Sequence, residues 1–139
     1  MAKIIIVYWT GGGNTEKMAG AIADGAKSKG ADVTCKNVSE ASVDELANYD
    51  VIVFGSPAMG AEVIEESEME PFFTSALPVI SGKKVALFGS YDWGDGEWLR
   101  TWEDRVKDGG ANFVASVKAH LEPDDDAIEE CKNFGGNLA

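Results

Sequence analysis

The chain has 139 residues and a formal net charge of −12, because 24 Asp and Glu residues stand against 12 Lys and Arg residues. A hydrophobic share of 45% and a charged share of 26% are typical of a globular domain and exclude wholesale disorder, so we expect residues 1–139 to form one domain. The acidic balance disfavours nucleic acid and anionic membranes as partners and favours basic protein surfaces.

Cysteine and histidine usage argues against a metal site. Cys35 and Cys131 stand far apart in no metal-binding or redox spacing, and His120 is the only histidine. We expect two buried or idle thiols in a reducing cytoplasm. No apolar run approaches the roughly 20 residues of a membrane span, and the start of the chain predicts a strand rather than a signal peptide.

Apolar runs and helical spacings alternate along the chain. The β-branched run at 3–8 predicts a strand covered on both faces, and apolar residues at every fourth position predict a helix over 14–29. Ser42-Val43-Asp44-Glu45 predicts a capping box that opens a short helix. Further strands are expected at 32–37, 51–54, 83–88 and 113–121, and further helices at 69–76, 99–107 and after Asp124.

This alternation predicts an α/β fold, a three-layer doubly wound five-stranded parallel sheet of order 2-1-3-4-5. In that order the topological switch point lies between the first and third strands, and ligands bind beyond the carboxyl ends of the strands. The loops after the first, third and fourth strands should therefore hold the site.

The first of these loops predicts an anion site built from neutral donors. Its glycines let backbone N–H groups approach an anion at a helix N-terminus, and Lys17 is expected to point outward. A P-loop needs a Gly-Lys-Ser/Thr sequence, and this loop has no lysine at that place. A dinucleotide-binding fingerprint needs a third glycine two residues further on, where Thr15 and Glu16 stand instead. A plain turn capped by Asn14 or Thr15 stays open as the alternative. The loop reads Thr10-Gly11-Gly12-Gly13-Asn14-Thr15.

The other two loops carry groups suited to a flat ring. Met59 offers a polarizable surface, Glu62 can accept from a ring N–H, and Trp93 stands among Asp and Gly residues as a stacking candidate. For each of the two loops a structural alternative stays open, in which Met59 or Trp93 covers the hydrophobic core. Trp98 and Trp102 stand four residues apart, as on one face of a helix, and are expected in the core. The loops read Pro57-Ala58-Met59-Gly60-Ala61-Glu62 and Gly89-Ser90-Tyr91-Asp92-Trp93-Gly94.

These loops do not contain the residues that a hydrolytic active site requires. His120 lies near the end of the last strand, so no Ser-His-Asp or Cys-His set forms, and no carboxylate pair stands out as an acid/base dyad. The predicted site can hold an anion and sandwich a ring.

Together the three loops resemble those of the flavodoxins, most of all the short-chain clostridial type. The resemblance spans the whole chain, with the loops in order and no extra segment splitting the last strand. It implies one FMN bound without a covalent link, with Thr10 to Thr15 and Ser90 on the phosphate. Met59 and Trp93 would cover the two ring faces and Glu62 would accept from N3–H. The Gly60 carbonyl would turn toward N5–H, and Gly89, Tyr91 and Gly94 would give backbone contacts.

Two positions depart from the family pattern. Gly12 stands where the family usually has threonine, so one hydroxyl donor to the phosphate is missing. Ala61 follows Gly60 where the family often has Gly, Asp, Asn or Ser, which bears on the ease of the peptide flip.

The resemblance implies a low-potential one-electron carrier, cycling through semiquinone and hydroquinone states between larger redox enzymes. It would be a monomer that meets basic partner surfaces transiently. Two alternatives remain at this point: a small NAD(P)H quinone or nitro reductase, and a receiver-type regulatory module. The second needs acids at the ends of the first and third strands, where Thr10 and Ser56 stand.

Overall fold

The computed structural model describes residues 2–60, 62–92 and 94–139. These residues form a five-stranded parallel sheet in the order β2-β1-β3-β4-β5, which confirms the predicted fold class. The sheet reverses its direction of growth between the neighbours β1 and β3, so the topological switch point lies there. The strands are β1 (Lys3–Tyr8), β2 (Asp32–Asn37), β3 (Val51–Gly55), β4 (Lys84–Tyr91) and β5 (Asn112–His120).

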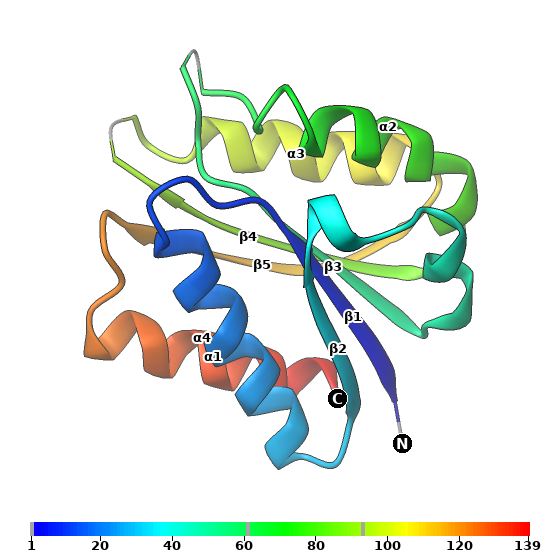
Figure 1. Cartoon of the computed structure of the whole chain (residues 1–139), viewed down its shortest axis with the longest axis horizontal. Helices are drawn as coiled ribbons and strands as arrows, with labels where there is room; N and C mark the ends of the chain where they lie inside the picture. The colour runs from blue at the N-terminus through cyan, green and yellow to red at the C-terminus, as the bar shows by residue number, and fades with distance from the viewer. Residues whose placement is uncertain (1, 61, 93) are drawn as a thin grey trace.

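Helices cover both faces of the sheet and complete the three layers (Figure 1). α1 (Asn14–Ser28) and α4 (Asp125–Leu138) lie on one face, and α2 (Met69–Ile80) and α3 (Glu97–Asp108) lie on the other. Side chains of a strand alternate between faces, so Ile5 joins the cluster under α2 and α3 while Ile4 joins the cluster under α1 and α4.

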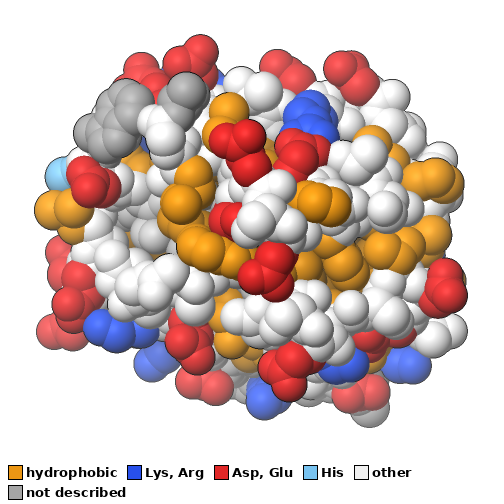
Figure 2. All heavy atoms as spheres, turned by 45° about the horizontal axis from the view of Figure 1, so that its top comes forward, with side chains coloured by type: hydrophobic (Ala, Val, Ile, Leu, Met, Phe, Trp, Pro, Cys, Tyr) orange, Lys and Arg blue, Asp and Glu red, His pale blue; other side chains and the backbone are white. Residues whose placement is uncertain are grey.

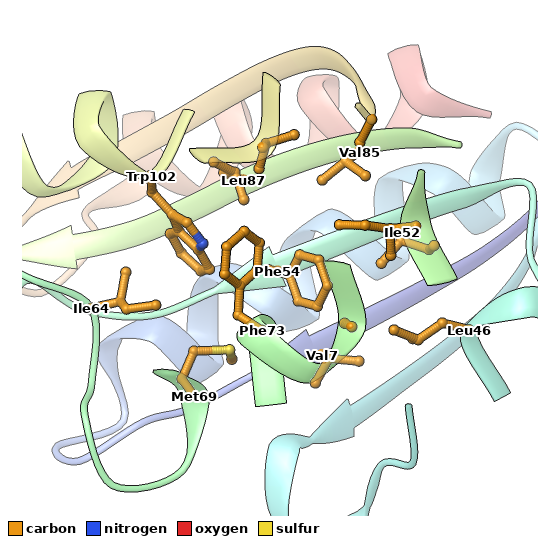
Figure 3. Packing of buried hydrophobic residues seen from close by; sticks show 14 of the residues in the cluster. Val7, Leu46, Ile52, Phe54, Ile64, Met69, Phe73, Val85, Leu87 and Trp102 are labelled. Atoms are coloured by element: carbon orange, nitrogen blue, oxygen red, sulfur yellow. The ribbon is translucent and has the colours of Figure 1, made fainter. Parts of the chain in front are cut away.

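The face under α2 and α3 has an aromatic centre (Figure 3). The rings of Phe54 and Phe73 meet edge to face with centroids 5.4 Å apart, and Trp102 lies 5.7 Å from Phe73. Trp98 and Trp102 are each 1% exposed, which confirms their prediction as core residues. This layer gives the loops above it a rigid base.

On the opposite face, α1 and α4 approach each other at two glycines. A Cβ at Gly25 would overlap the backbone carbonyl of Lys132, and a Cβ at Gly135 would overlap the backbone carbonyl of Ile22. The two helix backbones therefore come closer than any other residue at these positions would allow.

Several boundaries differ from the sequence prediction. β4 runs on through Gly89 to Tyr91, because these residues continue the ladder with β5, so part of the expected third loop is strand. α2 extends to the buried Ile80, and α3 begins at Glu97, directly after the left-handed Gly96.

The short helix expected after Ser42 is a tighter 3₁₀ helix, η2 (Asp44–Asn48), preceded by another, η1 (Val38–Glu40). The capping contact itself is present, since the Ser42 N–H donates to the Glu45 carboxylate over 2.8 Å. The connection between β2 and β3 is too short and polar to hold a full helix against the sheet.

Candidate functional site

A cavity of about 340 Å³ opens at the carboxyl ends of β1, β3 and β4, the edge of the sheet where the sequence predicts the site. Its volume is in the range of about 300–1,000 Å³ that is typical of small-molecule sites. The residues that line it are Trp9, Thr10, Gly11, Gly12, Asn14, Thr15, Pro57, Ala58, Met59, Ser90, Tyr91, Asp92 and Leu121.

Most of the predicted site residues lie on this wall, and the other described ones belong to the same chain segments. Gly13, Gly60, Glu62, Gly89 and Gly94 belong to the same segments but do not line the cavity, and Ala61 and Trp93 lie outside the described residues. Sequence reasoning misses Trp9, Asp92 and Leu121. Trp9 and Asp92 adjoin predicted residues and could have been included on that ground, whereas Leu121 directly follows β5 and has no motif around it.

The first loop leaves the N-terminus of α1 open to a ligand. Gly13 is the N-cap residue with a φ of 98°, and no side chain among the described residues caps the helix. The Thr10 hydroxyl oxygen instead accepts from the Gly13 N–H over 3.0 Å, which holds the loop in its curve. The alternative of a turn capped by Asn14 or Thr15 is therefore wrong, and the first N–H groups of the helix remain available to an anion.

A buried pair of hydroxyl groups joins the first loop to the end of β4. Thr15 Oγ1 and Ser90 Oγ lie 2.9 Å apart, and the two residues are 1% and 5% exposed. Each hydroxyl can donate once, so the pair has one proton beyond the one that it shares.

The second loop is tied to its neighbours by backbone hydrogen bonds. The Ala58 N–H donates to the Ser90 carbonyl over 2.9 Å, and Met59 and Val63 exchange two hydrogen bonds of 2.8 and 3.1 Å. Met59 is half-buried on the cavity wall rather than part of the core. At the base of the loop, the Trp98 indole donates to the Ser56 carbonyl over 3.1 Å.

A buried carboxylate closes the second loop onto α2. Glu65, 5% exposed, accepts from the N–H groups of Ser67, Glu68 and Met69 over 2.7 to 3.0 Å and from the Ser67 hydroxyl. Burial acts to raise the pKa of Glu65, but these donors outweigh it and hold the pKa below its usual value. The negative charge also lies at the N-terminus of α2, where the helix dipole favours it.

Glu62 places an unpaired acceptor between the second and third loops. Its Oε1 is buried and has no hydrogen-bond partner among the described residues. The carboxylate lies directly against Gly94, since a Cβ at that glycine would overlap it. A buried carboxyl oxygen without a donor is costly, so this atom is suited to accept from an N–H of a ligand.

The residues described on the cavity wall include no cation. Lys17, the nearest lysine in sequence, points away and pairs with Glu122 over 3.0 Å on the surface. Among the described residues, no group of three or more His, Cys, Asp or Glu side chains is placed to hold a metal. The described part of the site thus offers neutral donors to an anion and apolar side chains to a ring, and it places no nucleophile beside a base.

Comparison with known proteins agrees with this geometry. The family model described as flavodoxin matches residues 6–135. A flavodoxin of Clostridium beijerinckii is 50% identical over 134 residues, covering 96% of this chain and 97% of its own. A flavodoxin of Megasphaera elsdenii is 48% identical over 130 residues, covering 94% and 93%. The solution structure of the two-electron reduced M. elsdenii flavodoxin superposes with a TM-score of 0.89 at 47% identity, covering 96% of each chain.

The chain belongs to the flavodoxin family.

Flavodoxins are electron-transfer proteins that bind FMN and are not enzymes. Because the chain belongs to this family, the two alternative functions, an NAD(P)H reductase and a receiver-type regulatory module, are excluded. The groups at the cavity fit FMN: the N–H groups at the start of α1 suit a phosphate, and the unpaired Glu62 oxygen suits a ring N–H.

As an electron carrier, a flavodoxin exchanges electrons with redox partners. Among the helices of the described residues, none combines the length and the apolar character that crossing a membrane requires.

Proposed function

We propose that this flavodoxin shuttles single electrons between redox enzymes at low potential, with one FMN held without a covalent link in the cavity above β1, β3 and β4. The observation that carries the proposal is the cavity wall, which pairs an open helix N-terminus with apolar side chains and includes no cation among the described residues.

The first loop and the end of β4 would hold the phosphate. Asn14 and Thr15, at the uncapped start of α1, line the cavity, and the Thr15–Ser90 pair supplies a further hydroxyl proton. We assign the phosphate to Thr10, Gly11, Gly12, Gly13, Asn14, Thr15 and Ser90.

The second and third loops would hold the ring system. Met59 covers one face, and Trp93, outside the described residues, is assigned the other. Glu62 accepts from the ring N3–H, which gives its buried oxygen a donor. Gly60, with a φ of 42°, can turn its carbonyl toward ring nitrogen N5 because glycine adopts this conformation without strain. The remaining contacts are assigned to Pro57, Ala58, Ala61, Gly89, Tyr91 and Gly94.

Bound FMN supplies the one-electron chemistry, and the chain sets how much negative charge the site accepts. The negative charge of the phosphate stays uncompensated because the described wall has no cation. Asp92 on the wall and Glu62 beside it add further negative charge near the ring. A unit charge about 10 Å away contributes roughly 1 kcal/mol at an effective dielectric of about 20 to 40. Several such charges make the second one-electron reduction unfavourable, which gives the low potential.

The surface favours basic partners. In the view of Figure 2, acidic side chains are spread over the face that carries α2 and α3, while basic ones gather mostly along its lower border. With a net charge of −12, long-range attraction would steer this chain to positively charged docking faces and release it quickly. We further propose that residues 1–139 act as one domain, in the cytoplasm and as a monomer.

Titration of the apoprotein with FMN and with riboflavin, followed by flavin fluorescence, tests the assignment. FMN should bind one to one and at least about tenfold more tightly than riboflavin, because only FMN carries the phosphate. Glu62→Gln should weaken both ligands, since the amide is a poorer acceptor than the carboxylate. Equal affinity for the two flavins would contradict the phosphate cradle.

A further inference from the structure

Leu121 is the one residue of β5 and its following turn that reaches the cavity wall described above. It lies directly after the last residue of β5, lines the cavity, and is 50% exposed. No other described residue of that segment is part of the wall. It adjoins Tyr91, whose carbonyl accepts from its N–H and which belongs to the segments assigned above to the ring system.

The backbone of Leu121 is in the left-handed region, with a φ of 60°. For a bulky side chain this conformation is unfavourable, because the Cβ comes too close to the backbone carbonyl. Glycine or asparagine would make the same turn more readily. The turn alone therefore does not account for leucine at this position.

Contacts on both sides hold this conformation in place. The Leu121 N–H donates to the Tyr91 carbonyl over 2.7 Å, which continues the β4–β5 ladder by one step. The preceding His120 ring donates from Nε2 to the Asp92 carbonyl over 2.9 Å, and it lies 5.0 Å from the Tyr91 ring. On the other side, Glu122 pairs with Lys17 of α1. Strain of this kind persists where neighbouring contacts fix the backbone, and it is concentrated at ligand sites.

We propose that Leu121 is a further contact to the ring system of the bound FMN, held over the open side of the cavity at the expense of backbone strain. The proposal rests on the proposed function, since it takes FMN to occupy this cavity. Its side chain shields the ring from water, and its burial against the ring adds affinity in proportion to the apolar area covered.

Two substitutions distinguish the contribution of the Leu121 side chain from that of the backbone strain. Leu121→Asn keeps the size but removes the apolar surface and suits the left-handed conformation, whereas Leu121→Ala removes the side chain and keeps the strain. Both variants should bind FMN and riboflavin about fivefold more weakly, because a ring contact is common to the two ligands. Apoprotein carrying Leu121→Asn should melt about 2 to 6 °C higher than the unaltered chain, and apoprotein carrying Leu121→Ala should not.

Val114→Ala is the matched control, because Val114 is an aliphatic residue near the start of β5, 47% exposed and away from the cavity. It should leave both flavin affinities unchanged. Unchanged affinities in the Leu121 variants, a loss confined to FMN, or a lower melting temperature of Leu121→Asn apoprotein would each overturn the proposal. Failure of the unaltered chain to bind either flavin would contradict the proposed function as well, so the two failures are distinguishable.

Discussion

Thr15 Oγ1 and Ser90 Oγ form a buried hydrogen bond of 2.9 Å between residues 75 positions apart. It joins the first turn of α1 to the end of β4 at the cavity wall, so the two segments that would contact the phosphate are fixed to each other. Because the bond uses one hydroxyl proton, the other is free to donate to an anion.

Removal of either hydroxyl should therefore act on phosphate binding and not on the ring. Of Thr15→Val, which preserves volume, and Ser90→Ala, the variant that removes the donor to the phosphate should weaken FMN binding by about tenfold or more, the usual effect of losing a hydrogen bond to a charged group. The other variant removes only the partner that positions this donor, and it should weaken FMN binding by less. Riboflavin affinity should stay within about twofold. Ser116→Ala, on β5 and remote from the wall, is the control for fluorescence titrations with both flavins. An equal loss for FMN and riboflavin would count against this role.

Gly12→Thr should strengthen FMN binding. A Cβ at Gly12 meets nothing within 4 Å, so the added hydroxyl donor has room to reach the phosphate. We expect FMN affinity to rise about threefold to tenfold in the same titration. Gly13→Thr is the matched control: it has as much space, but its φ of 98° strains any side chain, so this variant should lose affinity and stability. Weaker binding by Gly12→Thr would contradict the prediction.

Gly135→Ala should destabilise the fold strongly. The new Cβ would overlap the Ile22 backbone carbonyl, which a side-chain rotation cannot relieve, so α1 and α4 must separate. Urea denaturation should show a loss of about 3 kcal/mol or more. Gly20→Ala is the control, because that helical glycine is exposed and its Cβ would meet nothing within 4 Å. It should stabilise the protein by up to about 1 kcal/mol; similar effects of both variants would be incompatible with the close helix contact.

The contribution of Glu65 to stability should depend on pH. Its pKa is lowered in the folded chain, so its stabilising effect is complete above the unfolded pKa of about 4.3 and is lost as the pH falls through the folded value. Glu65→Gln should lower the free energy of unfolding by about 2 kcal/mol at neutral pH, and the gap should close on acidification. Denaturant titrations between about pH 3 and 7 measure it. Glu66→Gln, at an exposed neighbour, should change stability by less than about 0.5 kcal/mol; a gap for Glu65→Gln that stays constant with pH would refute the mechanism.

The sheet order and the position of the cavity were predictable because buried parallel strands consist of continuous apolar runs, such as 3–8 and 51–54. Loops at the carboxyl ends of the first, third and fourth strands then had to meet. The extension of β4 through Gly89 to Tyr91 was not predictable, because those residues read as a turn and become strand only by pairing with β5.

Other features depend on contacts that no sequence pattern encodes. The Thr15–Ser90 bond requires the register of α1 against β4, and the place of Leu121 on the wall follows from one backbone angle at the end of β5. The roles assigned to Ala61 and Trp93 fall outside the described residues.

A spectroscopically monitored redox titration of the FMN-loaded protein tests the central claim most directly. The described wall of the cavity has no cation to compensate the phosphate, and acidic groups lie on it and beside it. This arrangement predicts two separate one-electron couples, with the second lower than the first by more than about 100 mV. Since 59 mV corresponds to a tenfold change for one electron, this is the shift that a few charges produce. A single two-electron transition at the potential of free FMN, or no FMN retained by the pure protein, would contradict the account.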